Sequence, residues 1–315
     1  MSARSMTLAT ALEGRTPLVL DGGLSNQLEA QGCDLSDDLW SARLLADDPG
    51  QIEAAHMAYV RAGAQVLITS SYQATYEGFA RRGVSRKETT ELLRRSVRLA
   101  RSAAERAGGG EPGPAGAPGA GPAWVAASVG PYGAMLADGS EYRGRYGLGV
   151  EELERFHRPR IEVLAGAGPD VLALETVPDL DEAVALLRAA EGCGLPVWLS
   201  YTIAGEATRA GQPLGEAFAL AAGNDQVIAV GVNCCAPEDA DRAVEIAADT
   251  TGKPVVVYPN SGEEWDAGAR GWRGRPTFGA ARVRAWRDAG ARLIGGCCRV
   301  GPDRIAELSA VLGER

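Results

Sequence analysis

Residues 171–201 read VLALETVPDLDEAVALLRAAEGCGLPVWLSY, and this stretch predicts one strand–helix–strand unit. Val171 to Leu174 and Val197 to Tyr201 are short, largely aliphatic runs without regular polar alternation, which is typical of strands buried on both faces. Between them, Leu180 to Ala190 carries apolar residues at helical spacing. A helix that joins two such strands covers one face of a parallel sheet, so the stretch indicates an α/β fold.

The same unit recurs along the whole chain. Eight strand-like runs are found at Pro17 to Leu20, Val66 to Thr69, Trp124 to Ser128, Val171 to Leu174, Val197 to Tyr201, Val227 to Val232, Val255 to Tyr258, and Arg292 to Ile294. Helix-like segments between them are Gln51 to Ala62, Arg86 to Ala107, Val150 to Ala165, Leu180 to Ala190, Pro237 to Ala248, Ala280 to Ala289, and Pro302 to Leu312. Eight alternating units favour a closed (βα)8 TIM barrel.

An open, doubly wound sheet is the alternative α/β fold. That fold commonly carries a Gly-rich nucleotide loop after its first strand. Here the first strand is followed by Asp21-Gly22-Gly23, which contains neither a GxGxxG motif nor the lysine of a P-loop. The barrel is therefore preferred.

The chain of 315 residues fits one barrel domain spanning 1–315, since such barrels commonly reach about 250 residues or more. One segment interrupts the pattern, because 108–122 reads GGGEPGPAGAPGAGP and offers little to a core. We expect a flexible surface excursion. A linker between two domains is disfavoured because the flanking parts would hold two and six units, and neither closes a barrel.

Composition excludes several classes of partner. The 41 Asp and Glu exceed the 32 Lys and Arg, so the net charge of −9 disfavours binding to nucleic acid. No apolar stretch approaches the roughly 18 residues of a membrane span, and the amino terminus lacks an export signal, so we expect a cytoplasmic protein. In that reducing compartment the six cysteines are better candidates for metal binding or reactivity than for disulfides.

The distinctive polar residues follow the predicted strands. The carboxyl ends of barrel strands converge on one mouth, where barrel enzymes carry their chemistry. The residues at these positions are Asp21, Ser70-Ser71-Tyr72-Gln73, Glu175-Thr176, Asn233-Cys234-Cys235, Pro259-Asn260-Ser261, and Gly295-Gly296-Cys297-Cys298. Residues that are far apart in the sequence are therefore predicted to be neighbours in space.

Cys234, Cys297 and Cys298 are predicted to share a zinc ion, Zn²⁺, because they follow the sixth and eighth strands, next but one around the rim. Zinc accepts three thiolates and keeps its fourth position open in catalytic sites. We expect Gly295-Gly296 to permit a turn that aims both following sulfurs inward. Adjacent residues of a strand face opposite ways, so Cys234 is preferred to Cys235.

A structural role is the alternative for single cysteines and for the two histidines. A free cysteine often packs as a small hydrophobic residue, and this reading suits Cys193 and Cys33. Paired cysteines at two strand ends fit a soft metal better. His56 and His157 lie in helical segments, so histidine catalysis is not expected.

Asp21 and Glu175 each end an apolar strand, where a charge is costly without a partner. A substrate ammonium group could be that partner, while an N-cap or a loop hydrogen bond is the structural alternative. Trp40 and Tyr72 are candidates for aromatic contact with a cationic ligand. The other polar candidates for substrate contact at these loops are Gln73, Asn233 and Asn260.

Six segments together carry a resemblance to a known family. They are DGGLSNQLEAQG (21–32), SYQAT (71–75), ETVPDLDEA (175–183), GVNCC (231–235), VVYPNSGEEWD (256–266) and GARLIGGCCR (290–299). These segments resemble the homocysteine S-methyltransferase family, especially its bacterial members that use S-methylmethionine. The resemblance runs from about Leu18 to Ile305, and GVNC paired with GGCC is its most specific signal.

The resemblance implies a (βα)8 barrel with a catalytic zinc on Cys234, Cys297 and Cys298. It also implies that Asp21 and Glu175 hold the amino group of homocysteine. Relatives commonly carry another residue in place of Cys235, which leaves Cys235 as an alternative ligand. The excursion at 108–122 is a further departure and is expected to be peripheral.

The expected reaction transfers a methyl group from a sulfonium donor, S-methylmethionine or S-adenosylmethionine, to homocysteine and forms methionine. Alternatives keep the barrel and change the partners, with betaine as donor or selenohomocysteine as acceptor. A non-catalytic zinc-binding barrel is another alternative, with Cys235 as fourth ligand. A module of a cobalamin-dependent methionine synthase is disfavoured, because the chain ends near Arg315.

Overall fold

The computed structural model of the protein describes residues 6–37, 39–108, 123–266 and 271–314. Eight parallel strands form one sheet in the order β1-β12-β9-β8-β5-β4-β3-β2. Their bounds are β1 (Leu18–Val19), β2 (Val66–Ile68), β3 (Trp124–Val129), β4 (Val171–Val177), β5 (Val197–Tyr201), β8 (Val227–Asn233), β9 (Val255–Tyr258) and β12 (Ala291–Ile294). These strands coincide with the eight predicted runs to within a few residues.

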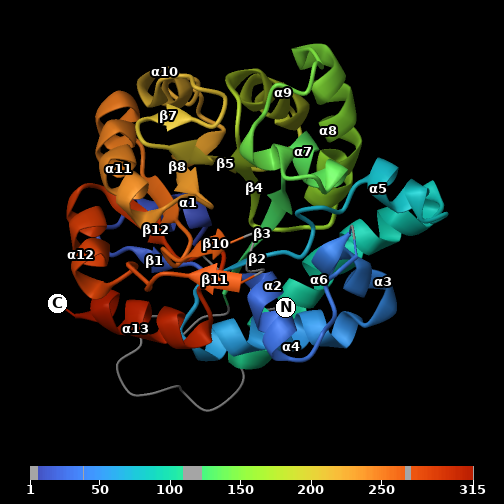
Figure 1. The fold of residues 1–315 in the computed structure, drawn as a ribbon, viewed down its shortest axis with the longest axis horizontal. Helices are drawn as coiled ribbons and strands as arrows, with labels where there is room; N and C mark the ends of the chain where they lie inside the picture. Colours follow the sequence, from blue (N-terminus) through green and yellow to red (C-terminus); the bar gives the residue numbers. More distant parts are fainter. Residues whose placement is uncertain (1–5, 38, 109–122, 267–270, 315) are drawn as a thin grey trace.

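The two ends of the strand order, β1 and β2, meet and close the sheet. Leu20 forms a parallel bridge with Val66, and the Asp21 N–H donates to the Val66 carbonyl at 3.1 Å. Below this bridge the Gln65 N–H donates to the Val19 carbonyl at 2.7 Å. Figure 1 shows the resulting ring of strands with the long helices outside it. The predicted (βα)8 TIM barrel is confirmed.

The outer layer consists of seven long helices, all predicted from the sequence. They are α4 (Pro49–Arg61), α6 (Arg86–Gly108), α8 (Val150–Gly166), α9 (Leu180–Ala190), α11 (Pro237–Thr251), α12 (Ala280–Asp288) and α13 (Pro302–Gly313). Their apolar faces pack on the outward side chains of the strands in one large cluster. No helix in the described part of the chain is long and apolar enough to span a bilayer.

Shorter elements were not predicted, because none is long enough to show a full repeating pattern. They are α1 (Leu8–Leu12), α2 (Leu24–Ala30), η1 (Trp40–Arg43), α3 (Leu44–Asp47), α5 (Tyr76–Arg81), α7 (Tyr132–Leu136), η2 (Ser140–Tyr142), α10 (Leu214–Ala219), and the hairpins β6 (Ile203–Ala204) with β7 (Ala207–Thr208) and β10 (Glu264–Asp266) with β11 (Gly271–Arg273). Apart from α1, all lie in connections that follow the barrel strands.

The barrel interior holds a second, smaller hydrophobic cluster. Side chains alternate along each strand, so Val171 and Ala173 of β4 face inward while Leu172 and Leu174 face the helices. Leu8 and Leu12 of α1 join the interior cluster together with Leu18, Trp124 and Val171, the first residues of their strands. Helix α1 therefore covers the amino ends of the strands. The inward positions at the carboxyl ends are left for the mouth.

The predicted excursion at 108–122 begins at the last residue of α6, and residues 109–122 lie outside the described part of the chain. Its surface location stays a prediction. It falls between α6 and β3, so it does not interrupt the strand order.

Gly231 offers a test of how tightly the barrel strands are packed. A Cβ at Gly231 of β8 would lie 1.9 Å from the carbonyl oxygen of Val256 in β9, and a backbone atom of a central strand cannot move away cheaply. We expect Gly231→Ala to lower the free energy of unfolding by about 2 kcal/mol or more. The matched control is Gly215→Ala in α10, where nothing lies within 4 Å of the added carbon and a gain of up to ~1 kcal/mol is expected. Equal urea midpoints for the two variants would contradict this packing.

Candidate metal centre and its surroundings

Three cysteine sulfurs meet at the carboxyl ends of β8 and β12. The sulfurs of Cys234, Cys297 and Cys298 lie within 4.8 Å of one another, and the cluster is of a kind that could hold a metal ion. The Cα atoms of Cys234 and Cys297 are 5.6 Å apart although 63 residues separate them in the chain. The sulfurs of these two cysteines are in contact. Metal binding at this cluster needs them as free thiolates.

The chemistry of the cluster suits a soft cation. Its three donors are sulfurs, and no histidine or carboxylate of the described residues joins them. Cys234 is buried and Cys298 is half-buried, and burial raises the pKa of the Cys298 thiol to about 11. A thiol with such a pKa becomes a thiolate at neutral pH when a cation binds it. The donor set therefore fits a thiolate-bound metal with room for a further ligand.

Cys235 lies apart from the cluster. It is fully buried and belongs to the hydrophobic core between the barrel and the helices, where burial raises its pKa far above the ordinary thiol value. Of the two adjacent cysteines, the structure thus places Cys234 with the cysteine pair that follows β12. This is the arrangement that strand alternation predicts.

Asn233 connects the loop of Cys234 with the loop of Glu175. The Thr176 N–H donates to Asn233 Oδ1 at 2.7 Å, and Asn233 Nδ2 donates to Thr176 Oγ1 at 2.7 Å. Ser200 Oγ donates to the same Oδ1 at 2.8 Å. Thr176 (φ 58°) and Cys234 (φ 49°) both adopt left-handed backbone, which is costly for residues other than glycine. The amide of Asn233 therefore holds the strained Thr176 of β4 in place, and the strained Cys234 follows Asn233 directly.

This engagement bears on the predicted role of Asn233. Both polar atoms of its side chain already bond to groups of the chain. Direct contact with substrate stays a prediction, while the structure shows a contact that orients the residues on either side of the site.

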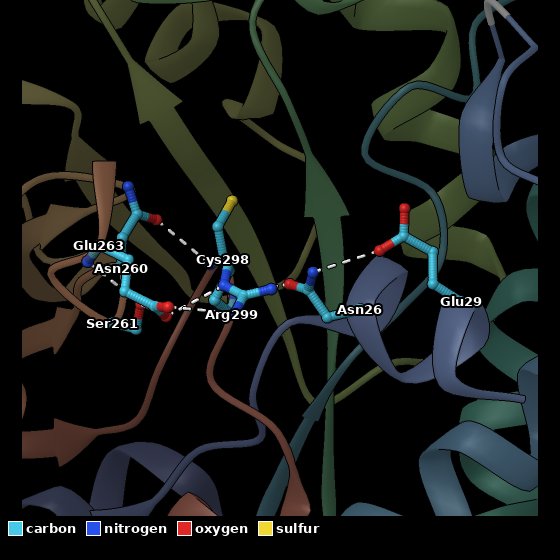
Figure 2. Close-up of polar contacts among 7 residues, drawn as sticks. All are labelled: Asn26, Glu29, Asn260, Ser261, Glu263, Cys298 and Arg299. Atoms are coloured by element: carbon cyan, nitrogen blue, oxygen red, sulfur yellow. Dashed lines mark hydrogen bonds and ion pairs between the residues drawn. The ribbon is translucent and has the colours of Figure 1, made fainter. Parts of the chain in front are cut away.

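The loop after β12 is fixed from two sides (Figure 2). Asn260 Oδ1 accepts a hydrogen bond from the Cys298 N–H at 3.1 Å, and the Ser261 N–H donates to the Cys298 carbonyl at 3.0 Å. The guanidinium of Arg299 binds both carboxylate oxygens of Glu263, at 3.0 and 3.1 Å. Sequence reasoning found Asn260 but missed Glu263 and Arg299, because 36 residues separate the pair.

A second contact reaches this loop from α2. The Arg299 N–H donates to Asn26 Oδ1 at 2.6 Å, and Asn26 Nδ2 in turn donates to Glu29 (Figure 2). Arg299 has a left-handed backbone, with φ 64°. The loop that carries Cys297 and Cys298 is thus tied to the elements that follow both β9 and β1.

The glycines beside the cysteines permit close backbone approach. A Cβ at Gly23 would lie 2.6 Å from the Cys297 carbonyl oxygen, and one at Gly22 would lie 2.1 Å from the Val300 carbonyl oxygen. A Cβ at Gly296 would lie 2.2 Å from Val300 Cγ1. Gly295 and Gly296 were predicted to permit a turn that aims the two following sulfurs inward. That explanation needs correction in part, because neither glycine has a positive φ. Gly295 is needed where the chain passes the end of β1, since its Cβ would lie 2.4 Å from Leu20 Cβ, and Gly296 is needed where the β12 loop folds back on Val300.

Two buried carboxylates face the mouth beside the cluster. Glu175 is 5% exposed and accepts hydrogen bonds from the hydroxyls of Tyr258, at 2.9 Å, and Ser128. Asp21 is 2% exposed, and its Oδ2 accepts from the Ile68 N–H at 2.9 Å while Oδ1 has no partner. Burial raises the pKa of Glu175 to about 7 in spite of its two hydrogen bonds. Burial first, and then the charge of Glu175, raise the pKa of Asp21 well above its ordinary value.

Such a pair is suited to a cationic group. A buried carboxylate without compensation is costly, and an ammonium group would supply both charge and hydrogen bonds. Asp21 and Glu175 were predicted in this role. The structure places them close enough for their charges to interact.

The remaining candidates lie at different places. Tyr72 is half-buried, and its hydroxyl interacts electrostatically with Thr176, next to Glu175. Gln73 is buried and its Nε2 donates to the Ala134 carbonyl of α7 at 3.4 Å. The backbone of Trp40 lies in η1, and its side chain is outside the described part of the chain.

His56 and His157 are both fully buried, in α4 and α8, and burial lowers the pKa of each to about 4. His157 Nε2 lies 2.9 Å from Glu182 Oε1 of α9. Neither histidine belongs to the cysteine cluster, as expected.

Ser128 and Ser200 were missed by sequence reasoning. Both occupy inward positions at the carboxyl ends of otherwise apolar strands, and Ser200 Oγ lies 2.8 Å from the Tyr258 hydroxyl. The sequence signal that could have found them is a serine at the same alternating positions as the inward-facing apolar residues of its strand. These hydroxyls form a polar layer between the hydrophobic interior and the mouth.

The raised pKa of Glu175 makes stability depend on pH. A carboxyl whose folded pKa lies above its unfolded value favours folding while protonated, and that contribution is lost as pH rises from about 4.5 to about 7. Glu175→Gln removes this loss. We expect the free energy of unfolding of the variant, minus that of wild type, to rise by on the order of 2–3 kcal/mol between pH 5 and pH 8. Urea unfolding of the ligand-free, metal-free proteins measures this difference. The same difference at both pH values would contradict a raised pKa.

Comparison with known proteins identifies the family. A family model described as homocysteine S-methyltransferase matches residues 18–312. Homocysteine S-methyltransferase of Escherichia coli (strain K12) is 46% identical, over 96% of this chain and 97% of that protein. Homocysteine S-methyltransferase 4 of Zea mays is 47% identical, over 94% of this chain and 89% of its own length.

A solved structure agrees with the sequence relatives. The metallated form of the E. coli homocysteine methyltransferase MmuM matches with a TM-score of 0.83 and 45% identity, covering 95% of this chain and 97% of that one. At this identity and coverage the match is more than a likeness of fold alone. This chain belongs to the homocysteine S-methyltransferase family and is a methyltransferase enzyme.

Proposed function

We propose that this chain transfers a methyl group from a sulfonium donor, S-methylmethionine or S-adenosylmethionine, to homocysteine, with zinc held by Cys234, Cys297 and Cys298. The observation that carries the proposal is the meeting of three cysteine sulfurs at one barrel mouth beside two buried carboxylates. The metallated form of the related E. coli enzyme supports a metal at such a mouth.

Zinc is proposed because the donor set consists of sulfurs. Soft thiolates select zinc among the common divalent ions, and three thiolates with an open fourth position are typical of a catalytic zinc site. When bound, the ion supplies a position at which the homocysteine sulfur stays deprotonated at neutral pH.

The residues of the chain bind and orient homocysteine. Asp21 and Glu175 bind its ammonium group, and the unpartnered Oδ1 of Asp21 is available as a hydrogen-bond acceptor. Tyr258 and Ser128 fix the carboxylate of Glu175 by their hydroxyls. With the ammonium group held, the substrate sulfur is directed to the cysteine cluster, which removes much of the entropic barrier to reaction.

The transfer needs no proton for the leaving group. The donor S–CH₃ bond breaks with its electron pair remaining on the donor sulfur, and a new S–CH₃ bond forms to the homocysteine sulfur, whose proton has been released. The positive charge of the donor is lost in the step, so the leaving thioether is neutral. This fits the burial of His56 and His157 within helices, away from the mouth.

The structure disfavours a closed, purely structural zinc site. Such a site needs four protein ligands, and Cys235, the candidate for the fourth, is buried in the core. Betaine as donor and selenohomocysteine as acceptor remain alternatives within the same chemistry, and parallel assays with each donor and acceptor distinguish them.

Adjacent cysteines supply a matched test of the metal site. In protein purified under reducing conditions, Cys298→Ala should lose both bound zinc and methionine formation, since one of three ligands is removed. Cys235→Ala should retain both, because its sulfur lies in the core. Metal analysis and assays with S-methylmethionine, S-adenosylmethionine and betaine provide the readouts. Undiminished methionine formation by a zinc-free Cys298→Ala protein would rule out the proposed role of the cluster, and turnover with betaine alone would rule out the sulfonium donor.

A further inference from the structure

A third buried carboxylate lies at the mouth, outside the site described above. Glu141 of η2 is 7% exposed, and its Oε2 is buried without a hydrogen-bond partner. Among the carboxylates of the described residues, only those of Asp21 and Glu141 have a buried oxygen without a hydrogen-bond partner. Because a buried, unpaired carboxylate is costly, Glu141 calls for an explanation.

The backbone of η2 is held tightly at the carboxyl end of β3. Helix α7 and then η2 follow β3, and a Cβ at Gly133 of α7 would lie 2.4 Å from the Glu141 nitrogen. A hydrogen bond from the Tyr142 N–H to the Gly139 carbonyl, at 3.1 Å, closes the turn. Glu141 therefore sits on a packed element, so its position is not that of a freely moving surface side chain.

Glu141 lies in η2, which packs against β4, the strand that carries Glu175. Its charge acts on Cys298, which follows β12, and on Tyr72, which follows β2, adding to the effect of burial in raising the pKa of both groups. Residues from three separate strand ends thus converge, and the carboxylate lies in the region where they meet. No Lys or Arg of the described residues is among the groups that act on the Glu141 carboxyl.

Aromatic rings accompany this carboxylate. Tyr142 is 39% exposed although it is a large ring, and its hydroxyl interacts electrostatically with Cys298 and Glu141. Tyr72 is a second ring in this region, and both Glu141 and Tyr142 act on it electrostatically. The guanidinium of Arg209 lies over the Tyr142 ring, 5.9 Å from its centroid, so Tyr72 is the ring beside Glu141 that suits an organic cation bearing alkyl groups.

We propose that Glu141 binds the α-ammonium group of the sulfonium methyl donor. This inference rests on the proposed function. Homocysteine brings one ammonium group, for which Asp21 and Glu175 are available, and Glu141 would then stay uncompensated. A donor such as S-methylmethionine brings two further cationic groups, an ammonium and a sulfonium.

The unpaired carboxylate oxygen of Glu141 favours the ammonium group over the sulfonium group as its partner. An ammonium donates hydrogen bonds to a carboxylate, whereas a sulfonium has no N–H or O–H to donate. The sulfonium, which must approach the cysteine cluster, is left to the ring of Tyr72. Glu141 would consequently select amino-acid sulfonium donors over donors without an amino group.

The test separates the two substrates kinetically. For Glu141→Gln in the zinc-loaded, reduced protein, we expect the KM for S-methylmethionine to rise about tenfold or more, the usual loss for a buried hydrogen bond to a charged group. The KM for homocysteine and the zinc content should not change. Glu141→Asp, which keeps the charge on a shorter side chain, should recover part of the loss, and exposed Glu151→Gln of α8 is the matched control that should match wild type.

Several results would overturn the inference. If wild type uses S-methylmethionine and Glu141→Gln has the same KM for it, the inference is wrong. It is also wrong if the KM values for S-methylmethionine and homocysteine rise equally and zinc is lost, because that result indicates a structural role. Dimethylsulfoniopropionate, a sulfonium without an amino group, distinguishes the two cations: an equal loss of kcat/KM with both donors would assign Glu141 to the sulfonium instead. If wild type transfers no methyl group from any sulfonium to homocysteine, the proposed function itself fails, and this inference with it.

Discussion

The site depends on the parallel order of the barrel strands, because β1, β12, β9 and β8 are neighbours and the loops after β1, β8 and β12 therefore meet at one edge. Cys234 and the pair Cys297-Cys298 are separated by a single strand, β9, in the sheet order. The β1 loop then packs so closely on the β12 loop that Gly22 and Gly23 have no room for a side chain. A parallel barrel thus sets both the spacing of the sulfurs and the position of Asp21 beside them, and chain connectivity alone would set neither.

The mouth collects negative charge at a cost to stability. Asp21, Glu141 and Glu175 are buried there beside three sulfurs that become anionic when a metal binds. Left-handed backbone at Thr176 and Cys234 adds strain, and the side chain of Asn233 holds Thr176 in place. In the proposed reaction, the metal, the homocysteine ammonium and the donor are the cationic ligands that would relieve the electrostatic part of this cost. Stored strain and uncompensated charge at a binding site are consistent with a scaffold that trades stability for function.

The fold and the central residues were predictable from the sequence, because their signals are local. Each strand is an apolar run, and each long helix shows its period. Asp21 and the cysteines follow strands, and Glu175 lies near the carboxyl end of β4. The contacts that orient these residues were not predictable. Asn233 reads as a polar residue at a strand end, and only the structure shows that its amide bonds to Thr176, 57 residues away. The pairing of Arg299 with Glu263 and the burial of Glu141 in a three-residue 3-10 helix depend equally on tertiary structure. Trp40 and the segment 109–122 lie where the structure gives no side-chain description.

X-ray absorption at the zinc edge tests the central claim most directly. The reduced, zinc-loaded protein should show three sulfur ligands and one lighter ligand, with Zn–S distances near about 2.3 Å. Addition of homocysteine should replace the lighter ligand by a fourth sulfur, because the three cysteines leave one position for the substrate. Four sulfur ligands before homocysteine is added, or an unchanged spectrum afterwards, would contradict an open site formed by Cys234, Cys297 and Cys298.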